Sequence, residues 1–264
     1  MNISKSALWL SVIDALLVLT ASASGIFLKS IYARETPSWA LQGIGQDIVN
    51  LVAVVVLCIA TYFVNRGSVK AFLVWSGVLL YLLYAYIIYA FALHFNSLFL
   101  VYVAILGLSF YALVGSVIHL HMDDLQAAFS PTPARLVSVF FLVLGSAFFL
   151  LWLREDVSAL VTGTIPPSVT QANVLTNPVH ILDLGLFLPA MLLTARLLWK
   201  RKLLGYLLAG SLLVFSSLMG TAILAIFLVM NWNGIATSVG VEAFFALIIV
   251  MSLFLSVLSL REVK

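Results

Sequence analysis

Residues 178–230 read PVHILDLGLFLPAMLLTARLLWKRKLLGYLLAGSLLVFSSLMGTAILAIFLVM, two long apolar runs joined by the basic turn Trp199-Lys200-Arg201-Lys202. Each run is as long as the roughly 20 residues that a helix needs to cross a bilayer. A tight basic turn beside an aromatic residue is typical of the cytoplasmic boundary of a membrane. The stretch therefore predicts two transmembrane helices whose connection faces the cytoplasm.

The same pattern of long apolar runs and short connections extends over the whole chain. Hydrophobic residues make up 64% of the sequence and charged residues 9%, against roughly 45–50% and 25% in ordinary globular proteins. Eight runs are long enough to span a membrane: about 7–28, 44–64, 70–93, 98–119, 133–153, 178–199, 203–230 and 238–260. We expect an all-α, polytopic integral membrane bundle of about eight transmembrane helices, with residues 1–264 forming a single transmembrane domain.

The basic residues predict how the chain is threaded. If the N-terminus is cytoplasmic, ten of the thirteen Lys and Arg residues fall on the cytoplasmic side, and only Lys29, Arg34 and Arg154 fall outside. The positive-inside rule therefore predicts that both termini are cytoplasmic. We expect a bacterial or archaeal plasma membrane, with membrane lipids as partners. The net charge of +3 does not indicate a nucleic-acid partner, because the basic residues lie at helix ends rather than along one stripe.

Several function classes lack the residues that they need. The single Cys58 excludes an intramolecular disulfide, and no lysine lies in mid-membrane to carry a retinal Schiff base. HExxH, GxGD and Walker motifs are also missing. The segment His119–Asp124 holds two of the four histidines, but side chains two residues apart on a helix point in different directions. We therefore predict no metal site and assign no cofactor.

Polar residues near the outer ends of four predicted helices form the candidate site. Ionisable groups inside a bilayer are costly unless they face protein or water, which makes them functional candidates. We predict that eight residues converge on one outward-facing ligand pocket: Asp47, Asn50, Tyr86, Tyr89, His94, His180, Asp183 and Glu242. The spacing of His180 and Asp183 places both on one helix face, where the carboxylate would hold the imidazole. Alternatively, Asp183 makes one structural hydrogen bond and the tyrosines serve helix packing.

Three functions fit this pattern. The first is transport of a small molecule, coupled to protons, or ligand sensing, with Pro189 kinking the helix that carries Asp183. The second is a membrane enzyme that acts on a lipid or a quinone-like substrate, although no nucleophile or metal set is recognisable. The third is a structural or accessory subunit, and an oligomer is compatible with the sequence. The outer polar cluster favours the first.

Overall fold

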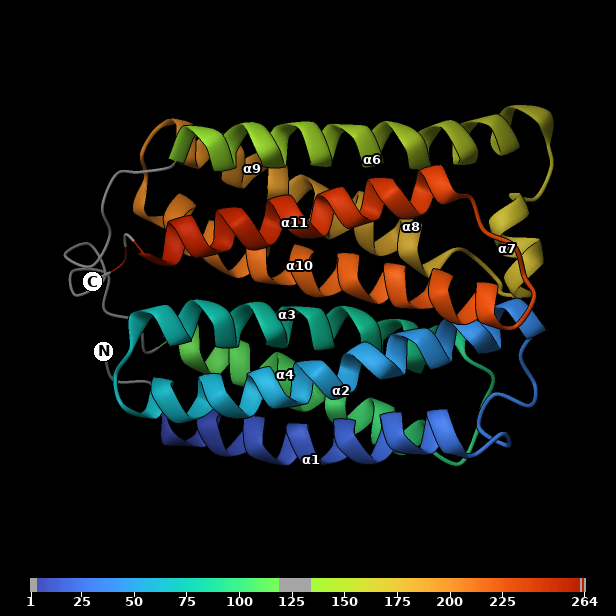
Figure 1. Ribbon diagram of the computed structural model, residues 1–264, viewed down its shortest axis with the longest axis horizontal. Coiled ribbons are helices and arrows are strands. Elements are labelled where there is room, and N and C mark those ends of the chain that lie inside the picture. Colours follow the sequence, from blue (N-terminus) through green and yellow to red (C-terminus); the bar gives the residue numbers. More distant parts are fainter. Residues whose placement is uncertain (1–3, 119–133, 262, 264) are drawn as a thin grey trace.

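A computed structural model describes residues 4–118, 134–261 and 263 (Figure 1). Eight helices of this described part are long and apolar enough to cross a membrane, which confirms the all-α polytopic bundle. They are α1 (Lys5–Phe27), α2 (Pro37–Asn65), α3 (Val69–Ala92), α4 (Phe99–Ile118), α6 (Ala134–Thr162), the segmented span Pro178–Trp199, α10 (Leu203–Trp232) and α11 (Val239–Arg261).

Two helices extend beyond the apolar runs from which they are predicted. α2 begins at Pro37 rather than near residue 44, because the Thr36 side chain accepts the backbone N–H of Trp39 and proline suits the first helical position. α6 continues through Arg154, Glu155 and Asp156 to Thr162. The length of an apolar run identifies only the lipid-spanning part of a helix. The polar extensions at the outer ends of these two helices are therefore predicted as loops from the sequence.

The helices form two groups that meet at α10. α1, α2, α3 and α4 pack against one another, while α6 packs on α9 (Leu188–Trp199), and α9 and α11 pack on α10. α10 also contacts both α2 and α3, so it joins the two groups (Figure 1). The start of α1 and the end of α11 lie at one end of the bundle, and the short helix α7 (Pro167–Ala172) lies at the opposite end. We refer to the α7 end as the outer end, following the predicted orientation.

Two of the glycines that permit close helix approach bear on the polar segment of α2. A Cβ atom at Gly45 would lie 2.5 Å from the Cα of Ile226, so α2 and α10 touch almost backbone to backbone. A Cβ at Gly25 on α1 would lie 2.0 Å from Oδ2 of Asp47 on α2. Small residues commonly permit such approaches between membrane helices. Both glycines therefore fix the position of the α2 segment that carries the polar residues.

The sixth span is divided into three parts. α8 (Pro178–Leu182) is followed by a π-helical turn, η1 (Asp183–Phe187), and then by α9. In the π-helical turn the N–H of Leu188 reaches back five residues to the carbonyl of Asp183. Pro189 follows directly and has no N–H to continue the regular pattern. The expected irregularity around this proline therefore takes the form of a π-bulge, a feature frequent at functional sites.

Candidate functional site

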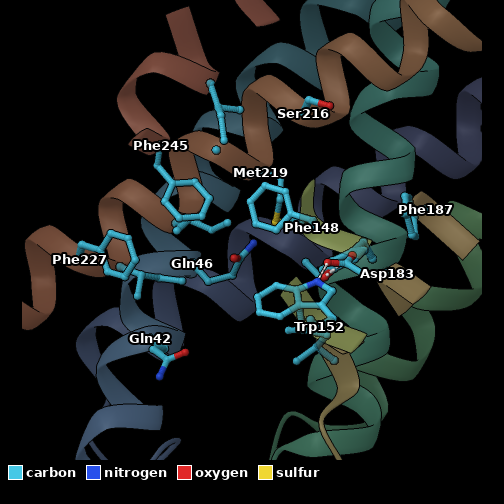
Figure 2. A pocket seen from close by; sticks show the side chains of 18 of the residues that line it. Gln42, Gln46, Phe148, Trp152, Asp183, Phe187, Ser216, Met219, Phe227 and Phe245 are labelled. Carbon is cyan, nitrogen blue, oxygen red and sulfur yellow. Dashed lines mark hydrogen bonds between the residues drawn. The ribbon is translucent and has the colours of Figure 1, made fainter. Parts of the chain in front are cut away.

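A cavity of about 620 Å³ lies in the outer half of the bundle, between the two helix groups. Its walls come from α2, α3, α6, α7, α8, η1, α9, α10 and α11. Most of the lining is apolar and aromatic, including Phe148, Phe187, Met219, Phe227 and Phe245 (Figure 2). The polar side chains that also line it include Gln42, Gln46 and Asp183. A cavity of this size with few polar groups has the usual character of a small-molecule site.

Asp183 is held at the cavity wall by two donors from other helices. The indole Nε1–H of Trp152 on α6 donates to Oδ2 at 2.8 Å, and the hydroxyl of Tyr84 on α3 donates to Oδ1 at 3.1 Å. Figure 2 shows the Trp152 indole beside this carboxylate. The π-helical turn begins at Asp183 itself. Three separate helices thus fix the orientation of this carboxylate, which keeps unused acceptor capacity toward the cavity.

His180 contacts a different carboxylate from the one that its spacing predicts. Its Nδ1 lies 2.9 Å from Oδ1 of Asp156, and its Nε2 lies 4.0 Å from Oε2 of Glu155. The imidazole also stacks on the Trp152 ring, with the ring centres 4.4 Å apart. His180 therefore lies behind Trp152, and it meets Asp183 through that indole rather than by a direct hydrogen bond.

A second polar network surrounds Asp47, whose side chain is fully buried. Its Oδ2 accepts the hydroxyl of Tyr32 at 2.6 Å, and its Oδ1 accepts that of Tyr89 at 3.1 Å. The amide of Asn50 lies 3.5 Å from Oδ1. Burial raises the pKa of Tyr32 well above its ordinary value, and the nearby Asp47 carboxylate acts in the same direction. Tyr32 therefore keeps its proton and acts as a donor.

Glutamine, tyrosine and asparagine link this network to the cavity. Gln46, which lines the cavity, donates to the Tyr81 hydroxyl at 2.7 Å. Tyr81 in turn donates to Oδ1 of Asn50 at 2.9 Å. Tyr89 also lines the cavity, and its hydroxyl lies 3.1 Å from the carbonyl of Gly43. The Asp47 network therefore reaches the cavity at two points.

The other predicted residues make local contacts away from the cavity lining. His94 binds Glu35 twice, through its backbone N–H at 2.7 Å and its Nδ1 at 3.0 Å. Glu242 accepts hydrogen bonds from Asn231 and from the Thr237 hydroxyl in the turn before α11. Tyr86 lies 3.5 Å from the Ser22 hydroxyl and packs against the rings of Tyr89 and Tyr102. These residues hold connections and helix contacts together.

The structure thus brings two of the eight predicted residues, Tyr89 and Asp183, to the cavity wall. Asp47 and Asn50 lie one hydrogen bond behind it. Tyr86 packs on Tyr89 and His180 stacks on Trp152, whereas His94 and Glu242 lie in separate clusters. The sequence does not indicate four partners of these residues: Tyr32, Glu35, Trp152 and Asp156. The first two lie in a predicted loop and the last in another, where spacing carries no information about contacts across the bundle.

Metal binding has no geometric support in the described part of the chain. There, no three His, Cys, Asp or Glu side chains are grouped so that they could hold a metal ion. The His119–Asp124 segment lies outside the described residues.

Comparison of the chain with protein-family models, curated proteins and solved structures finds no match.

Proposed function

We propose that this multi-pass membrane protein binds a lipophilic small molecule with hydrogen-bond acceptor groups in the outer cavity, and that it acts in transport or ligand sensing. The observation that carries this proposal is an apolar cavity of about 620 Å³ whose lining includes polar donors without partners. Ligand pockets commonly measure about 300–1,000 Å³ and combine apolar walls with a few orienting polar groups.

Two of these donors are the indole Nε1–H of Trp39 and the hydroxyl of Ser216. Both atoms are buried, both residues line the cavity, and neither atom has a hydrogen-bond partner among the described residues. A buried donor without a partner costs about 1–3 kcal/mol. An indole N–H can only donate, so a ligand oxygen that met this group after a shift of the Trp39 side chain would recover that cost. This favours ligands that carry carbonyl, ester or ether oxygens.

The polarity of the cavity lining also changes along the membrane normal. Ser38, Gln42 and Gln171 line it near the outer end, whereas Leu144 and Ile248 line it near mid-membrane. An elongated amphiphile would therefore place its polar group toward the outer end and its apolar part among the aromatic residues. Asp183 and Trp152 lie between these regions and would orient the polar group.

Native mass spectrometry of protein released from lipid nanodiscs tests the proposal. We expect one discrete adduct per chain in the wild-type protein. Ile223→Trp enlarges a side chain that already lines the cavity and should abolish the adduct. The matched control is Leu228→Trp on the same helix, where the side chain is 58% exposed on the outside, and it should retain the adduct.

Two results would contradict the proposal. Heterogeneous phospholipid without a discrete adduct in the wild-type protein would favour an accessory subunit. An adduct that persists in Ile223→Trp would place the ligand somewhere other than the cavity.

A further inference from the structure

Asp47 is a buried carboxylate without a cationic partner. Its side chain is 0% exposed, and none of the ion pairs in the described residues includes it. Its hydrogen-bond partners are neutral: the hydroxyls of Tyr32 and Tyr89 and the amide of Asn50. Burial of an unpaired charge in a membrane protein is costly and is characteristic of functional groups. A proton on Asp47 would remove that charge without any movement of the helices.

The surroundings of Asp47 are neutral on every side that packs against it. α1 contributes Ser22 and the bare backbone of Gly25, and the connection after α1 contributes Tyr32. α3 contributes Tyr86 and Tyr89, and α4 contributes Tyr102. The titratable groups that contact Asp47 are therefore tyrosines, which keep their protons at neutral pH. Two further carboxylates act on this tyrosine cluster: Asp14 of α1 on Tyr86, and Glu35 on Tyr102. Asp47 is the group in this cluster that can gain and lose a proton.

Tyr89 provides the shortest connection from this carboxylate to the cavity. Its hydroxyl lies 3.1 Å from Oδ1 of Asp47, and Tyr89 itself lines the cavity. A hydroxyl both donates and accepts hydrogen bonds. It can therefore accept a proton from Asp47 while its own proton passes to an oxygen in the cavity, and the reverse transfer restores the starting state. In each direction one O–H bond breaks for each O–H bond that forms.

We propose that Asp47 is a proton-binding site that exchanges its proton with the cavity through Tyr89, so that proton and ligand occupancy are coupled. The coupling rests on the proposed function, because it needs a ligand in the cavity, whereas the proton site does not. A ligand oxygen that accepts from Tyr89 would compete with Asp47 for this donor. Gln46, Tyr81 and Asn50 would transmit a second effect of the ligand to the same carboxylate.

Infrared difference spectroscopy of the full-length protein in nanodiscs tests the proton site without any ligand. We expect a carboxylic C=O stretching band that appears as the pH falls and is lost in Asp47→Asn. In Tyr89→Phe the band should move to higher frequency, because the protonated carboxyl group loses its hydrogen bond to Tyr89. Tyr111→Phe removes the hydroxyl of a residue that is 65% exposed on α4 and should leave the band unchanged.

The same spectra test the coupling when a lipophilic probe is added. Decylubiquinone is a suitable probe because it has two carbonyl acceptors, and its binding can be followed by quenching of tryptophan fluorescence. We expect bound probe to shift the Asp47 band in the wild-type protein and to shift it less in Tyr89→Phe, where only the connection through Gln46, Tyr81 and Asn50 remains. If Asp47→Asn and the wild type have identical spectra at every pH, the proton site is wrong. If Tyr89→Phe leaves the band unmoved, the exchange through Tyr89 is wrong. Bound probe without a band shift would refute the coupling alone. Absence of any adduct or quenching would count against the proposed function, while the ligand-free spectra would still decide the proton site.

Discussion

Replacement of Gly45 by alanine tests the contact that joins the two helix groups. The added Cβ would lie 2.5 Å from the Cα of Ile226 and 2.7 Å from its backbone nitrogen. Because both of these atoms belong to the backbone, no side-chain rotation relieves the clash. α2 and α10 must therefore separate, and Ile226 is itself part of the cavity wall.

The expected loss of stability follows from two opposing effects. Overpacking of this kind costs about 1–3 kcal/mol, while alanine in place of glycine returns up to about 1 kcal/mol of helix propensity. We expect a net loss of about 1–2 kcal/mol in the free energy of unfolding. Gly107 on α4 is the matched control, since nothing lies within 4 Å of its added Cβ. Gly107→Ala should therefore be neutral or stabilising by up to about 1 kcal/mol.

The assay is unfolding in mixed micelles of increasing SDS content, followed by tryptophan fluorescence. Gly45→Ala should unfold at lower SDS content than the wild type, and Gly107→Ala at the same or higher content. The close approach of α2 and α10 would be refuted if the two variants unfolded together. A shifted cavity wall should also weaken the native adduct in Gly45→Ala and leave it unchanged in Gly107→Ala.

Three further predictions concern the polar clusters and the orientation. Asp183→Asn should weaken adduct binding at least tenfold. The amide NH₂ of asparagine would either face the Trp152 N–H, donor against donor, or leave the Tyr84 hydroxyl without an acceptor. Unchanged binding at every pH tested would show that this carboxylate is not part of the site. Glu35→Gln should lower the free energy of unfolding, measured by SDS titration, by about 1–3 kcal/mol. The reason is that the Glu35 side chain is 1% exposed and accepts hydrogen bonds from the backbone N–H and the imidazole of His94. Equal stability of the variant and the wild type would contradict this role. Tags on both termini should resist an external protease in sealed cells, and cleavage of either tag would reverse the orientation.

The membrane spans could be predicted from the sequence because their cause is local. A run of about 20 apolar residues must cross the bilayer as a helix, whatever it packs against. The polar start of α2 and the polar end of α6 were missed because lipid does not dictate them. The start of α2 depends instead on a helix cap at Thr36, a signal that the sequence contains before the apolar run begins.

The candidate site could be predicted only in part, because its contacts cross between helices. Spacing places His180 and Asp183 on the same helix, but it does not reveal that α6 extends far enough for Asp156 to contact the imidazole. Nor does it reveal that Trp152 lies between the two residues and donates to Asp183. Helical periodicity determines which face a residue occupies, whereas the neighbour on that face depends on how the helices assemble.

Because of the position of the cavity, transport and sensing would require different conformational changes. Its lining residues on α6, α10 and α11 extend inward only to Leu144, Phe215 and Ile248, so the cavity occupies the outer half of the bundle. On the inner side, the Ser138 hydroxyl donates to the carbonyl of Ala195 at 2.7 Å and binds α6 to α9. Transport would require these inner contacts to open in a second conformation. Sensing would require only that α10, which touches both helix groups, shift when the cavity is filled.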